Sequence, residues 1–147
     1  MPHLSVDAML CAAQISVALQ TIVSREIDPL DAAVVSVGKM ENEEGSSACG
    51  CGSTFNVLCD KVVMHGTTRS FNNQVQQKVR SSVERIAIKV AEALNATATV
   101  KWDDINYGHP ATVNSTAETA LARAASVNVV GEGGIRTGKE IMTMGGT

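Results

Sequence analysis

The chain has 147 residues, of which 44% are hydrophobic and 3% aromatic, and its formal net charge is −3. This length fits one ordinary domain, and the apolar fraction is too high for a disordered chain. The small charge provides no basic surface for nucleic acid or for a membrane, and no apolar run approaches the ~20 residues of a membrane span. We therefore expect neither nucleic acid nor a membrane as a partner.

The cysteine pattern indicates a reducing, cytoplasmic setting. Cys11, Cys49, Cys51 and Cys59 do not form the framework of a small disulfide-rich domain. Cys49-Gly-Cys51 offers two thiolates for a soft metal, but no second Cys or His pair accompanies it. Free thiols in a loop are the simpler interpretation.

The first third of the chain predicts a helix followed by a strand. In residues 5–25 apolar side chains recur every three or four positions, Ser5 is a suitable N-cap, and the pattern stops before Asp28-Pro29. Residues 32–37 are rich in β-branched side chains and predict a strand. The polar and glycine-rich stretch 41–54 predicts a loop, in which Glu41, Glu43 and Glu44 are solvated charges.

The middle of the chain predicts extended structure, a second helix and another strand. Residues 56–71 read as extended, most clearly over 61–70. Apolar residues then recur at helical spacing through 73–95, with Asn72 or Asn73 as N-cap. Residues 97–103 alternate between apolar and polar, which is typical of a half-buried strand. A further helix is predicted over 114–130, with Leu121 on its apolar side.

This order predicts an α+β fold, a two-layer sandwich with two helices on one face of an antiparallel sheet. One more strand in front would complete the β-α-β-β-α-β order, the split βαβ or ferredoxin-like arrangement. The helix at 114–130 is an addition at the C-terminal end.

Five short strings resemble one family of enzymes. They are PHLSVDAML at 2–10, ALQTIVSREIDPLDAAVVSVG at 18–38, FNVLCD at 55–60, GTTRSF at 66–71 and VNSTAE at 113–118. In content, order and spacing they resemble the zinc metallopeptidase and amidohydrolase family of aminoacylases, hippurate hydrolase and auxin-conjugate hydrolases.

The resemblance implies a domain assignment. Members of this family have a metal-binding catalytic domain interrupted by a small lid domain, which in many of them mediates dimerisation. By this resemblance residues 1–110 are the lid, with its first strand expected before Met1, and residues 111–147 begin the return into the catalytic domain. The implied partners are a second copy, bound through the lid sheet or helices, and a small N-acyl amino acid or peptide substrate.

The family's catalytic metal, zinc or another divalent ion, is not expected to bind this segment. Hydrolysis by metal-activated water needs several His, carboxylate or Cys ligands and a general base. In the family these come from strings that this sequence does not contain, and His3, His65 and His109 lack the spacing of a metal site. We therefore predict no catalytic residue, no metal ligand and no cofactor in these 147 residues.

Two residues are implied as substrate contacts. Arg69 in GTTRSF matches a lid arginine that binds the substrate carboxylate in several relatives, and a guanidinium offers a planar fork for that group. A solvated strand arginine or a surface ion pair is the alternative. Strand alternation places Arg69 on one face with His65 and Thr67.

Asn56 in FNVLCD matches a lid asparagine that in some relatives reaches into the active site of the partner subunit. An amide donor there would help to hold the substrate or a developing oxyanion. An ordinary turn asparagine before a strand is the alternative, and Cys59 stands where the family usually has proline.

The sequence thus supports two hypotheses of different classes. The first is the dimerisation and lid segment of a metal-dependent amidohydrolase, inactive by itself. The second is a free-standing protein–protein association module, since a sandwich of two helices and one sheet can associate through exposed strand edges.

Overall fold

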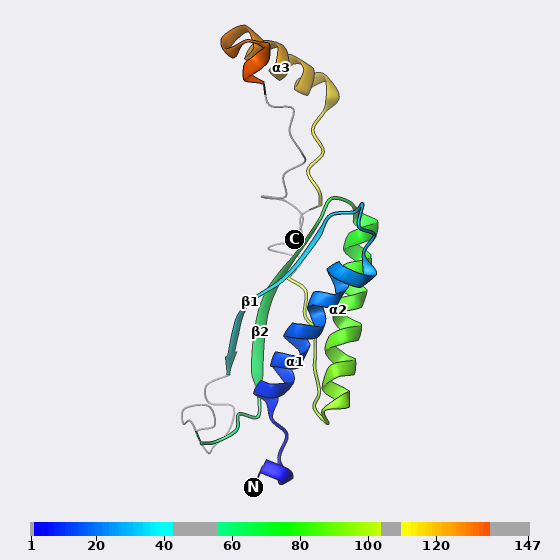
Figure 1. Cartoon of the computed structure of the whole chain (residues 1–147), viewed down its shortest axis with the longest axis vertical. Coiled ribbons are helices and arrows are strands. Elements are labelled where there is room, and N and C mark those ends of the chain that lie inside the picture. The colour runs from blue at the N-terminus through cyan, green and yellow to red at the C-terminus, as the bar shows by residue number, and fades with distance from the viewer. Residues whose placement is uncertain (1, 43–55, 104–109, 136–147) are drawn as a thin grey trace.

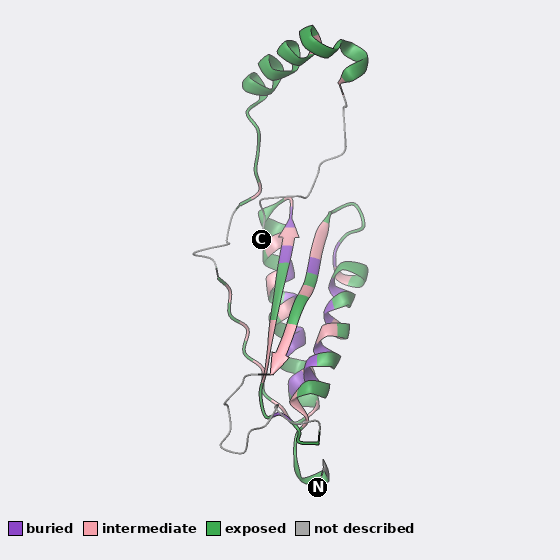
Figure 2. Cartoon of the chain, turned by 90° about the vertical axis from the view of Figure 1, so that its left-hand side faces the viewer, coloured by how far each residue is buried: buried purple, intermediate pink, exposed green. Residues whose placement is uncertain are grey.

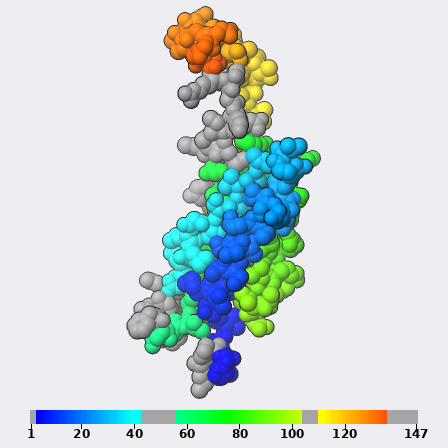
Figure 3. Space-filling model, viewed as in Figure 1, coloured from blue at the N-terminus to red at the C-terminus, as the bar shows by residue number. Residues whose placement is uncertain are grey.

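The structure is a computed structural model, and it describes residues 2–42, 56–103 and 110–135 (Figure 1). Two long helices pack on one face of a two-stranded antiparallel sheet, which gives the predicted α+β sandwich of two layers. The helices lie behind the sheet when its open face is viewed (Figure 2), and they lie side by side in the space-filling view (Figure 3).

Helix α1 (Ala8–Thr21) follows a single 3-10 turn, η1 (Pro2–Leu4). The predicted N-cap Ser5 is wrong by two residues, because the carboxylate of Asp7 accepts the hydrogen bond from the amide of Leu10 at 2.9 Å. The helix continues as a π-helical turn, η2 (Ile22–Glu26), and ends before Pro29 as expected.

Strands β1 (Ala33–Asn42) and β2 (Val62–Ser70) form the sheet. β1 extends five residues beyond the predicted end at 37, because a bulge between Val37 and Lys39 absorbs Gly38 and lets pairing resume. Glu41, predicted in a loop, therefore lies in the strand, whereas Glu43 and Glu44 lie outside the described residues. Opposite the bulge, Gly66 approaches so closely that a Cβ would meet the carbonyl oxygen of Ser36 at 2.7 Å.

Helix α2 (Asn73–Ala93) confirms the clearest helical pattern in the sequence. Asn72 is its N-cap, and the side-chain oxygen of Asn72 accepts from the amide of Val75 at 2.8 Å. The predicted apolar stripe faces the core, with Val79 only 1% exposed.

The core lies where the stripes of α1 and α2 meet the inner face of the sheet. Ile22 and Val79 are its most completely buried large side chains. The buried residues of this core are Cys11, Ile15, Leu19, Ile22, Ile27, Val35, Val75, Val79, Ile86, Ala87 and Ala91.

Residues 97–103, predicted as a strand, do not form one. The segment is extended, and its side chains alternate as predicted, with Ala98 and Val100 packed against the core and Thr99 exposed. The alternation is therefore correct, but within the described residues the sheet comprises β1 and β2 alone, and neither strand pairs with the segment.

Helix α3 (Thr116–Val130) forms close to its predicted bounds but buries none of its residues. Leu121, predicted on a packed apolar face, is 72% exposed. Among the described elements α3 contacts only the short 3-10 turn that follows it, η3 (Glu132–Gly134), and Figure 1 shows it apart from the sandwich.

The N-terminal helical stretch Ala8–Glu26 is 19 residues long and has a mean hydropathy of 1.3, which is enough for a membrane span by length and composition. The expectation of no such apolar run overlooked this stretch. One face of this stretch packs into the core through Ile15, Leu19 and Ile22. That arrangement is typical of a core helix in a soluble protein.

Replacing Ile22 should test the importance of this core. We expect Ile22→Ala to lower the free energy of unfolding by about 2–5 kcal/mol, because it leaves a cavity beside fully packed neighbours. Val17→Ala, on the outer side of α1 where Val17 is 70% exposed, should change it by less than about 0.5 kcal/mol. Urea unfolding followed by circular dichroism measures both, and equal losses would contradict this account of the core.

Candidate functional site

The open face of the sheet carries the first predicted site residue, Arg69. Thr68 and Ser70 are buried on the helix side of β2, so Arg69 between them projects from the opposite face, where it pairs across the sheet with Val34. His65 and Thr67 are exposed on the same face, as strand alternation predicted.

The same face also carries a cluster of three charged or titratable side chains. Glu41 accepts from Lys39 Nζ at 2.7 Å and lies 3.3 Å from His65 Nε2. The hydrogen bond from Lys39, and then that from His65, lowers the pKa of the Glu41 carboxyl. The bulge at Gly38 makes this cluster possible, since it turns Lys39 and Glu41 outward together.

Asn56, the second predicted site residue, is exposed in a turn before β2. Arg69 lies near the other end of that strand. At ~3.3 Å per residue, about 23 Å of strand separate Val62 from Arg69. Figure 1 shows residues 56–61 beyond the start of β2, so Asn56 and Arg69 of one chain lie toward opposite ends of the strand.

No metal site is present in the described part of the chain. No three His, Cys, Asp or Glu side chains gather there. Cys11 and Cys59 are buried free thiols, and burial raises the pKa of Cys11, which makes it a poor ligand and nucleophile. His109, Cys49 and Cys51 fall outside the described residues. The donor set does not fit the family's catalytic metal.

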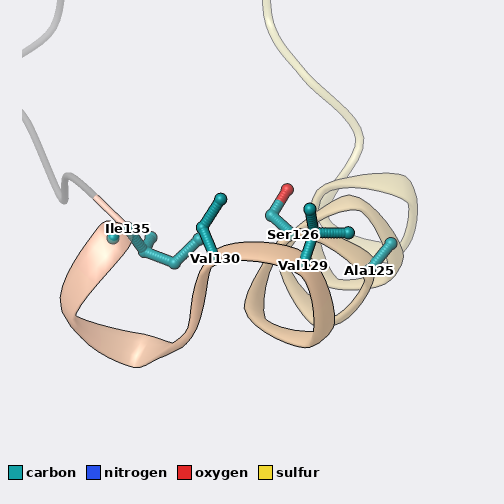
Figure 4. Close-up of a pocket in the computed structure, with 6 residues that line it drawn as sticks. Ala125, Ser126, Val129, Val130 and Ile135 are labelled. Atoms are coloured by element: carbon teal, nitrogen blue, oxygen red, sulfur yellow. The ribbon is translucent and has the colours of Figure 1, made fainter.

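Two open hollows lie on the surface of the described part of the chain. One, of about 580 Å³, lies on α3 and η3 and is lined by Ala125, Ser126, Val129, Val130, Gly134 and Ile135. Its labelled side chains offer a single hydroxyl among carbon atoms (Figure 4). The other, of about 420 Å³, lies between α1 and α2 beside Glu26 and Arg85. Neither brings together groups that suit a chemical step.

Sequence reasoning missed two polar clusters that join distant parts of the chain. The Glu26 carboxylate accepts from Ser82 Oγ and from Arg85 at 2.6 Å each. The indole of Trp102 donates to Glu84 at 2.7 Å, and the Arg80 guanidinium lies 4.8 Å from the centre of the Trp102 ring. Ser82 and Arg85 lie 56 and 59 positions from Glu26 in the sequence, so no local pattern indicates the first cluster.

The relatives of this chain include deacetylases and an amino acid hydrolase. It is 37% identical over 126 residues to the N-acetyl-L-cysteine deacetylase of Bacillus subtilis (strain 168), which is 86% of this chain and 27% of that enzyme. It is 37% identical over 106 residues to the N-acetyldiaminopimelate deacetylase of Lactococcus lactis subsp. cremoris (strain SK11), 72% of this chain and 26% of that one. It is 32% identical over 132 residues to the IAA-amino acid hydrolase ILR1-like 4 of Arabidopsis thaliana, 89% of this chain and 28% of that protein. The chain belongs to the amidohydrolase and aminoacylase family.

A solved structure supports the same fold for this amidohydrolase-family chain. The match to the structure of an aminohydrolase from methicillin-resistant Staphylococcus aureus covers 87% of this chain and 30% of the aminohydrolase chain. Its TM-score is 0.66 and the sequence identity is 24%. No protein-family profile matches the chain. The chain thus spans about a quarter of the length of its curated relatives.

The Glu26 cluster makes stability depend on pH in a defined direction. Hydrogen bonds from Arg85 and Ser82 lower the pKa of Glu26. Its contribution to stability is therefore complete above the ordinary carboxyl pKa of ~4.3 and is lost as the pH falls through the lowered value.

We expect Glu26→Gln to destabilise the amidohydrolase-family chain near neutral pH, and the difference from wild type to shrink as the solution is acidified. Ser82→Ala, which removes the second donor, should give a smaller loss of the same sign. Urea unfolding at a series of pH values measures this, and a difference independent of pH would contradict it.

Proposed function

We propose that this chain is the dimerisation and lid segment of a metal-dependent amidohydrolase that hydrolyses N-acyl amino acids or similar amides. The observation that carries the proposal is the match of 86% of the chain to about a quarter of a deacetylase, together with a two-layer sandwich whose open face is polar. A lid of this kind closes over the substrate and excludes water from it.

Arg69 is the proposed anchor for the substrate carboxylate. It projects from the open face of the sheet rather than into the core, and a guanidinium binds a carboxylate through two parallel hydrogen bonds. Neighbouring side chains on that face, such as Thr67, are exposed and leave room for a ligand.

The separation of Asn56 from Arg69 favours a shared arrangement in a dimer. Because the two residues lie toward opposite ends of the strand, we propose that Arg69 serves the active site of its own protomer and Asn56 that of the partner. Each active site then receives an arginine and an asparagine from different copies. Such an arrangement makes closure of the lid dependent on dimerisation.

The metal and the general base of such an enzyme are proposed to come from residues outside these 147, since the described part of the chain gathers no metal-binding cluster. No chemical step is assigned to the chain's own residues, whose role is to bind and to position. We propose a cytoplasmic location for the enzyme. The fold that this proposal implies is ferredoxin-like, with β2, α2 and residues 97–103 as one half of a split βαβ unit.

A free-standing association module is the second candidate function. It is favoured by the open strand edges of a sheet that has only two described strands. Such a module would associate with a partner but would not support hydrolysis when placed inside an enzyme of the family.

A chimera tests the lid function and Arg69 together. The 126 residues of the B. subtilis deacetylase that align with this chain would be replaced by this chain's residues. We expect the chimera to deacetylate N-acetyl-L-cysteine. Arg69→Ala should lower its kcat/KM by tenfold or more, mainly through KM, because a hydrogen bond to a charged group contributes about 1.5–3 kcal/mol.

Two controls accompany this experiment. Arg69→Lys should recover only part of the loss, because an ammonium lacks the planar fork, and Thr67→Ala on the same face should leave kcat/KM unchanged. A folded but inactive chimera would favour the association module. An active chimera that is indifferent to Arg69→Ala would rule out the proposed anchor.

Sedimentation equilibrium tests dimerisation of the chain itself, which we expect to form a dimer. Leu10 and Val17, 53% and 70% exposed, lie on the outer side of α1. If the helices form the interface, Val17→Asp should dissociate the dimer while Ser36→Asp, which adds the same charge on the open face of the sheet, should not. Persistence of the Val17→Asp dimer would assign the interface to the sheet, and a strict monomer at high concentration would contradict dimerisation.

A further inference from the structure

We draw no further inference here: the strongest candidate, the exposed apolar patch of Leu10 and Val17 on the outer side of α1, belongs to the helix surface already proposed for dimerisation, and nothing in the described part of the chain shows another occupant for it.

Discussion

The packing of α1 and α2 over one face of a narrow sheet is the constraint on which the rest of the structure depends. Ile22 and Val79 lie at the centre of that contact and are excluded from solvent. Since two strands alone are rarely stable in water, the helices must supply most of the apolar contact that keeps β1 and β2 paired. Everything assigned to the open face, including Arg69 and the Glu41 cluster, is positioned from behind by this layer.

Support from one side explains why the proposed functional surface is a face and not a cavity. The residues proposed to contact substrate lie on a strand and in a turn of the sandwich, and no metal-binding cluster gathers in the described part of the chain. Such a surface encloses a substrate only when another domain or subunit covers it. Under the proposed function, the separation of Asn56 from Arg69 makes each active site depend on residues from two copies of the chain.

Sequence reasoning succeeded where a local pattern carried the information. The stripes of α1 and α2, the cap at Asn72 and the side of β2 that carries Arg69 all follow from spacing. It failed where the outcome depended on distant partners. Residues 97–103 have the alternation of a strand but no described strand is paired with them, and none of the described helices or strands covers the apolar side of α3. The Glu26 cluster brings Glu26 to Ser82 and Arg85, which lie 56 and 59 positions later in the chain, so no local sequence pattern reveals it. The length of β1 was underestimated because Gly38 interrupts its alternation.

The bulge at Gly38 has a consequence for the fidelity of folding. With Gly38 absorbed, Met40 points inward and Lys39 and Glu41 point to water. If β1 slipped by one residue to erase the bulge, both charges would turn toward the helices, at a cost of several kcal/mol for each buried ion. Lys39 and Glu41 thus favour the correct strand register, because they make the misaligned pairing of β1 with β2 far less stable than the native one.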